Sequence, residues 1–297
     1  MDERRVGVLG ATSLVGEHLI AYFIKNCWRV TAFTRRAIVP KTVFNAQISW
    51  QSLAKRNYDK TNVAQIPIPY WVCVAPIWVL PDYFDLLIAL GVRRIVCLSS
   101  TSRFTKNDSP DLQERQIAQK LVQSEELLRT WANSSAIEYI ILRPTLIYGY
   151  GHDKNVAEIA KFIQRFGFFP VLGTAKGLRQ PIHVDDVVFA CFAALGALNF
   201  KNCSYNLAGG EVLPYRDMVI RIFERLNRRP RLLTIPFWCF RFFVAGIRWI
   251  PRYRFMKLAM AERMNQDLQF DYSEAQRDLC FSPRHFRLTI EDLPGTN

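Results

Sequence analysis

The chain has 297 residues, half of them hydrophobic, and a formal net charge of +13 at pH 7. This length and apolar content can bury a substantial core, which excludes a mainly disordered chain and favours one large domain or two unequal ones. The first residues show no basic stretch followed by an apolar block, so we expect no secretory leader. The seven cysteines are scattered without a Cys-x-x-Cys pair, which favours reduced thiols in a cytoplasmic protein.

Short apolar runs alternate with amphipathic stretches over the first half of the chain. The runs predict strands at residues 4–9, 28–33, 70–75, 94–99 and 139–142, and the stretches predict helices at residues 15–25, 82–90 and 112–131. Continuously apolar strands suit burial on both faces of a sheet. We therefore predict an α/β fold, a Rossmann-type doubly wound parallel sheet with helices on both sides.

A glycine-containing turn joins the first predicted strand to the first predicted helix. Gly10 permits a tight turn, Gly16 permits close packing of helix on strand, and Ser13 stands at the middle glycine position of a dinucleotide-binding turn. A helix N-terminus in this place binds pyrophosphate through its backbone N–H groups. We predict cofactor contacts at Gly10, Thr12, Ser13, Leu14, Val15 and Gly16.

Two arginines, Arg35 and Arg36, follow the second predicted strand. An acidic residue at this place binds the ribose hydroxyls of NAD, whereas an arginine suits the 2′-phosphate of NADP. The pair favours NADP as cofactor, with NAD as the alternative. The other interpretation, solvated surface charge, stays open.

The regular alternation ends near residue 150. We expect residues 1–150 to form the dinucleotide-binding Rossmann domain and residues 151–297 to form mainly a smaller substrate-binding subdomain, with segments near residues 180–207 returning to the main sheet. The positive charge is concentrated in this second part, where residues 215–257 hold eleven basic and two acidic side chains. Because no recognition helix or interleaved aromatics accompany the charge, we expect an anionic small molecule as partner and no nucleic acid.

The segment at residues 235–254 is apolar but contains several arginines. It is too short and too charged to span a bilayer. Two interpretations stay open. One is an interfacial helix that gives peripheral contact with the inner face of a membrane, and the other is a helix that covers the substrate pocket.

Five segments occur along the chain in a recognisable order. They are GATSLVG from Gly10, VCLSST ending at Thr101, ILRPT followed by Tyr148, RQPIHVDD from Arg179, and YNL from Tyr205. In this order they resemble the NAD-dependent epimerase/dehydratase family of the extended short-chain dehydrogenase/reductase superfamily. The resemblance implies an NAD(P)-dependent oxidoreductase or epimerase acting on a sugar, nucleotide-linked or lipid-linked. It also implies cofactor contacts at Ala75, Ser99 and Pro144, and a homodimer formed through the helix at 112–131.

The family pattern is incomplete in its catalytic residues. Family members use a tyrosine, a lysine four residues later, and a Ser or Thr at a strand end that Thr101 matches. No tyrosine lies between Tyr83 and Tyr139, so the chain resembles an atypical member. A non-catalytic dinucleotide-binding sensor or a membrane-associated structural subunit is therefore the alternative function.

The helix at residues 112–131 can be aligned to the family in two ways. In the first, the glutamate that follows the lysine in the family is matched to Glu125 or Glu126. This alignment puts Ile117 or Ala118 at the tyrosine position and Leu121 or Val122 at the lysine position. A shifted alignment instead puts Lys120 in the place of the lysine, as a cofactor contact or as an ordinary surface side chain. Lys120 and Thr101 are the candidate catalytic residues.

Two further residues are candidates for substrate binding. Arg179 resembles the position at which nucleotide-sugar enzymes hold a phosphate, and Tyr148 follows the segment that lies beside the nicotinamide in the family. Leu146 replaces an asparagine that nucleotide-sugar enzymes carry, which weakens a nucleotide-sugar assignment. The four histidines show no metal-ligand spacing, so we expect no metal.

Overall fold

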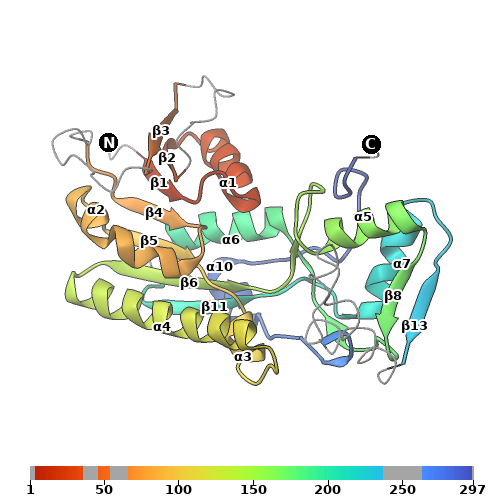
Figure 1. The fold of residues 1–297 in the computed structure, drawn as a ribbon. Coiled ribbons are helices and arrows are strands. Elements are labelled where there is room, and N and C mark those ends of the chain that lie inside the picture. Colours follow the sequence, from red (N-terminus) through yellow and green to blue (C-terminus); the bar gives the residue numbers. More distant parts are fainter. Residues whose placement is uncertain (1–3, 36–45, 54–65, 198, 237–262, 296–297) are drawn as a thin grey trace.

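The computed structural model describes residues 4–35, 46–53, 66–197, 199–236 and 263–295. Seven parallel strands form the main sheet in the order β11-β6-β5-β4-β1-β2-β3. This order confirms the predicted Rossmann-type doubly wound sheet (Figure 1). The strands are β1 (Arg5–Leu9), β2 (Arg29–Thr34), β3 (Ile48–Ser52), β4 (Tyr70–Cys73), β5 (Arg94–Leu98), β6 (Glu138–Pro144) and β11 (Cys203–Leu207).

The central strands form because their side chains are apolar on both faces. All five residues of β5 are buried, and four of the five in β1 are buried. The structure adds β3, which the sequence analysis did not predict. None of its residues is buried, and it contains Ser49 and Gln51, so this edge strand lacks the apolar run that identifies the others.

Helices cover both faces of the sheet. On one face lie α1 (Leu14–Lys25), α6 (Val184–Gly196) and α10 (Ser273–Leu279), and on the other lie η1 (Ile77–Tyr83), α2 (Phe84–Ala89) and α4 (Leu112–Ser134), beside the short α3 (Ser102–Thr105). The predicted helix at 82–90 begins earlier, as the 3₁₀ helix η1, and this turn contains Pro81. Proline donates no backbone N–H, so the α-helix proper begins only after it, at Phe84.

A smaller unit lies beside the sheet and has a hydrophobic core of its own. It is built around α5 (Val156–Phe166), α7 (Tyr215–Arg225) and the pair β8 (Phe169–Leu172) and β13 (Leu232–Ile235), which Figure 1 shows at one end of the molecule. Two two-residue pairings complete it and join it to the sheet: β7 (Ile147–Tyr148) with β10 (Ile182–His183), and β9 (Leu178–Arg179) with β12 (Leu213–Pro214). A domain boundary at residue 150 stays a prediction.

A buried ion pair ties the C-terminal segment to the start of α6. His183 Nε2 lies 3.0 Å from Asp292 Oδ1, and His183 Nδ1 lies 3.4 Å from Asp185 Oδ2. Burial lowers the pKa of His183, but hydrogen bonds to the two carboxylates outweigh burial and raise this pKa to about 9. Burial raises the pKa of Asp292, but hydrogen bonds from His183 and Thr289 outweigh burial and lower this pKa to about 2.

These pKa shifts predict how stability depends on pH. The contribution of His183 is fully present below its ordinary pKa of 6.5 and is lost as pH rises through about 9, because the folded state binds the proton more tightly. We expect the difference in free energy of unfolding between wild type and His183→Gln, measured with urea, to be larger at pH 6 than at pH 10. His152→Gln, at an exposed position, should show no such difference. An equal effect of His183→Gln at both pH values would contradict the prediction.

Candidate functional site

The turn after β1 has a backbone that only glycine fits. Gly10 has a φ of +85°, and a Cβ there would lie 2.5 Å from the backbone nitrogen of Ala75. A Cβ on Gly16 would meet the carbonyl oxygen of Gly10 and lie 2.9 Å from Ala11 Cα. The two glycines therefore let β1, β4 and the first turn of α1 approach one another closely, as a dinucleotide cradle requires.

The helix that follows presents its N-terminus at this turn. Ser13 is the N-cap of α1 and accepts a hydrogen bond from the Gly16 backbone nitrogen at 3.1 Å. Thr12 and Leu14 are half-buried beside it, and Val15 is buried. β1 lies between β2 and β4, where the strand order reverses, which is the place at which doubly wound sheets bind ligands. The residues at this turn fit the pyrophosphate of a dinucleotide.

The predicted adenosine-side residues lie at neighbouring strand ends. Arg35 follows β2 and is exposed, whereas Arg36 lies outside the described residues. Ala75 follows β4, and its backbone nitrogen donates to the Leu9 carbonyl at 3.2 Å. Arg35 and Ala75 thus follow the two strands that flank β1 in the sheet.

The ends of β5 and β6 bring together Ser99, Thr101 and Pro144. Thr101 is buried, and both its backbone nitrogen and its hydroxyl donate to the Pro144 carbonyl at 3.2 Å. The Ser99 hydroxyl donates to Glu125 Oε1 at 2.6 Å. Ser99 is therefore engaged with the helix beneath the strand end, and the Thr101 oxygen keeps its capacity to accept a hydrogen bond.

Glu125 on α4 is the centre of an ion cluster under this strand end. Its side chain is 1% exposed and pairs with Arg143 at 2.7 Å and with Arg103. Burial raises the pKa of Glu125, and hydrogen bonds from Arg143 and Ser99 outweigh burial, so the net pKa is lowered. The carboxylate is thus held charged between two guanidinium groups.

The residues of α4 that can be aligned with the family's tyrosine and lysine differ in burial. Ala118 and Leu121 are buried and Ile117 is half-buried, whereas Val122 is exposed. The buried face of α4 therefore carries Ala118, Leu121 and Glu125, and no tyrosine or lysine of this helix is buried. Lys120 lies among the exposed residues of α4 and does not line the cavity described next.

A cavity of about 770 Å³ runs between the carboxyl edge of the sheet and the smaller unit. Ser100, Thr101 and Thr145 line it at the sheet, and residues of α5, β8 and α7 line it at the far side. Its described lining contains six basic side chains and one acidic side chain, Glu158: Lys106, Lys154, Lys161, Arg165, Arg179 and Arg263. This surplus favours an anionic ligand.

Arg179 is the most deeply buried of the cavity cations, with 5% exposure. It donates to the carbonyls of Leu178 at 2.7 Å and Gln266 at 2.8 Å and to that of Arg263, and its guanidinium lies 5.3 Å from the ring centre of Tyr215. Burial lowers its pKa to about 10. A guanidinium held by neutral carbonyls keeps its charge for a ligand, which suits a phosphate.

The structure does not bring Tyr148 to the cavity. Its side chain is fully buried, edge-on to the rings of His183 and Phe286, and it does not line the cavity. Burial raises its pKa further from neutrality. Tyr148 therefore packs between the sheet and the C-terminal segment.

Several cavity residues were missed by sequence reasoning. Lys106, Lys154 and Arg263 come from loops or a 3₁₀ turn far apart in the chain, and Phe162 comes from α5. No local motif marks them, because only the packing of the smaller unit against the sheet brings them together.

The two interpretations of the segment 235–254 fall mostly on undescribed residues. Only residues 235 and 236 are described, so the interfacial helix and the helix that covers the pocket both lie outside the described residues. Within the described ranges, no helix is both long enough and apolar enough to cross a membrane.

The chain is similar to proteins of known family over part of its length. Residues 83–208 match the model of the NAD dependent epimerase/dehydratase family. A UDP-glucose 4-epimerase of Vibrio cholerae is 22% identical over 161 residues, 54% of this chain and 47% of that protein. The matched part of the chain spans about half the length of the first curated relatives.

Solved structures share the fold over almost the whole chain. A UDP-glucose 4-epimerase of Thermotoga maritima, solved with UDP-glucose, has a TM-score of 0.69 at 16% identity and covers 97% of this chain and 95% of its own. A UDP-glucuronic acid 4-epimerase of Bacillus cereus, solved with NAD, has a TM-score of 0.70 at 16% identity, with 97% and 93% covered. Residues 83–208 thus match the NAD dependent epimerase/dehydratase family, and the seven-stranded sheet has the fold of these solved epimerases.

Proposed function

We propose that the chain is an NAD(P)-dependent oxidoreductase or epimerase that acts on a sugar carrying a phosphate or diphosphate. One observation carries the proposal: a single cavity joins Thr101, at the end of β5, to Arg179 and five further cations. β1 and β5 are two strands apart, about 10 Å, which an extended dinucleotide spans from the glycine turn. The solved relatives named above hold UDP-glucose or NAD, which supports the same assignment.

The residues of this chain have separate roles in the proposal. The turn from Gly10 to Gly16 holds the pyrophosphate, and Arg35 favours NADP over NAD. Arg179 and the other cavity cations bind the substrate phosphate, and Thr101 orients a sugar hydroxyl. A bound nicotinamide accepts or returns a hydride. A homodimer through α4 and a position at the inner face of a membrane stay predictions.

A second candidate is a protein that binds dinucleotide without turnover. The observation that favours it is the buried face of α4, which carries no tyrosine or lysine. The side chains that can be aligned with the family's pair, Ile117 or Ala118 and Leu121 or Val122, cannot exchange a proton or contact a ribose hydroxyl by hydrogen bonding. Catalysis by this chain therefore needs a proton acceptor from another element or from the substrate.

Turnover separates the two candidates. We expect the protein with NADPH or NADH and a panel of UDP-sugars and lipid-linked sugars to oxidise, reduce or epimerise a substrate, followed by nicotinamide absorbance and product analysis. Thr101→Val should lower kcat/KM at least tenfold, because the substrate loses an orienting hydrogen bond. Thr130→Val, on the exposed face of α4, should change it less than twofold. Tight cofactor binding without turnover favours the second candidate, and no binding of either nucleotide at millimolar concentration contradicts both.

A further inference from the structure

The cavity has two chemically different ends. Near the sheet it is lined by the hydroxyls of Ser100, Thr101 and Thr145 and, further along, by Arg179. At the far side it is bounded by apolar side chains of the smaller unit's core: Ile159, Phe162, Phe169, Met218 and Met264. A ligand that fills it would carry polar groups at one end and an apolar group at the other.

The apolar end is made chiefly by one face of α5. Ile159, Phe162 and Phe166 follow one another at helical spacing. The Phe162 ring centre lies 4.6 Å from that of Phe166 and 5.6 Å from that of Phe169. Phe166 lines the cavity and is still 40% exposed, so this end reaches the protein surface.

The apolar side chains of this wall offer no polar partner to a nucleotide base. Ile159, Phe162, Phe166, Phe169 and Pro170 have no hydrogen-bonding group in their side chains, and the polar residues of the same segment that line the cavity are Asn155, Glu158, Lys161 and Arg165. A base placed against the phenylalanine rings would depend on these flanking side chains for its hydrogen bonds. A hydrocarbon chain gains affinity from the same surface, because its burial removes apolar area from water.

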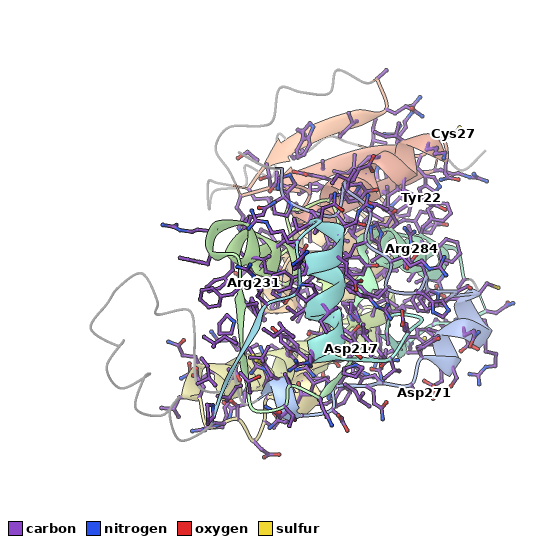
Figure 2. All side chains as sticks on the ribbon, turned by 90° about the vertical axis from the view of Figure 1, so that its right-hand side faces the viewer. Tyr22, Cys27, Asp217, Arg231, Asp271 and Arg284 are labelled. Carbon is purple, nitrogen blue, oxygen red and sulfur yellow. The ribbon has the colours of Figure 1, made fainter. Side chains whose placement is uncertain are left out.

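Basic and apolar side chains also surround the surface end of the cavity. The Arg165 guanidinium lies 5.3 Å from the Phe166 ring centre, and Arg228 donates to the Ile163 carbonyl at 2.8 Å. The Arg231 carbonyl accepts from the Phe169 backbone nitrogen at 2.9 Å, and nearby Leu233 is 54% exposed. Figure 2 views this side of the molecule and labels Arg231 near α5. Exposed arginines beside apolar side chains suit an anionic lipid surface.

We propose that the cavity takes a sugar joined through phosphate or diphosphate to an isoprenoid chain, with the phosphates at Arg179 and the chain against Phe162 and Phe166. This substrate class rests on the proposed function. If the proposal holds, the phenylalanine wall adds affinity for the isoprenoid chain that does not depend on the affinity of Arg179 for the phosphates.

Three diphosphates test the proposal by isothermal titration with the full chain: inorganic pyrophosphate, UDP, and farnesyl diphosphate below its critical micelle concentration. We expect farnesyl diphosphate to bind at least tenfold more tightly than UDP. Phe166→Ala should raise the Kd of farnesyl diphosphate five- to tenfold and change the Kd of UDP and of pyrophosphate less than twofold. Phe189→Ala is the matched control, since Phe189 lies on α6 away from the cavity and is 37% exposed.

The outcomes separate this inference from the function on which it rests. Tighter binding of UDP than of farnesyl diphosphate, or equal effects of Phe166→Ala and Phe189→Ala, would overturn the isoprenoid assignment and leave a phosphate-binding sugar enzyme standing. Failure of all three diphosphates to bind would overturn the proposed function as well. Lys154→Ala, at an exposed cavity cation, should weaken the binding of all three diphosphates.

Discussion

Replacing Gly16 by alanine is expected to weaken NADPH binding at least 100-fold. The added Cβ would meet the Gly10 carbonyl and the backbone of Ala11, and backbone atoms cannot move aside as a flexible side chain does. The turn and the first residues of α1 would have to shift together, which moves the backbone N–H groups of the helix N-terminus out of hydrogen-bond geometry with the pyrophosphate. Titration followed by nicotinamide fluorescence measures the loss.

Gly196 supplies the matched control for this substitution. It is the last residue of α6, and a Cβ there would meet nothing within 4 Å. Gly196→Ala should leave NADPH affinity unchanged and keep the free energy of unfolding equal or raise it by up to about 1 kcal/mol. A Kd for NADPH within twofold of wild type in a folded Gly16→Ala protein would show that the cofactor does not lie on this turn.

Replacing Glu125 by leucine is expected to cost about 3–5 kcal/mol of unfolding free energy. Its carboxylate is 1% exposed and pairs with both Arg103 and Arg143. Leucine would leave two arginines close together without a counter-charge, and the hydroxyl of Ser99 would lose its acceptor. Urea unfolding followed by circular dichroism measures the change.

Substitution of the neighbouring residue shows whether the loss of stability comes from the ion cluster or from a general effect of leucine on α4. Glu126 is exposed on the same helix, and Glu126→Leu should change the unfolding free energy by no more than about 0.5 kcal/mol. Glu125→Gln, which keeps the shape and one acceptor oxygen, should fall between the two. A loss below 1 kcal/mol for Glu125→Leu would mean that the arginines find other partners.

The predicted strands and most predicted helices agree with the structure because their signals are local. The runs that became β1, β2, β4, β5 and β6 consist mainly of apolar residues, and α1 and α4 carry apolar residues at helical spacing. The strand β3 was missed because its edge position leaves it without a buried run.

The candidate site was predictable only in part. The glycine turn could be identified because the backbone itself requires glycine there. Lys120 and Tyr148 were selected by spacing and by resemblance, and the structure places one among exposed residues and the other fully buried, outside the cavity. Spacing alone does not determine which helix face turns toward the sheet, whereas the bonds of Glu125 to Arg143 and Ser99 do.

The sequence by itself determined the alternation of strands and helices up to β6 apart from β3, the sharp turn at Gly10 and the absence of a tyrosine from α4, because each depends on residues close together in the chain. Only the tertiary structure decided the cavity. Its cations and its phenylalanine wall come from the residue after α3, from α5 and the loop before it, from β8 and β9, and from residues after 262. These segments meet because the smaller unit must bury its own apolar core and packs beside the sheet to do so.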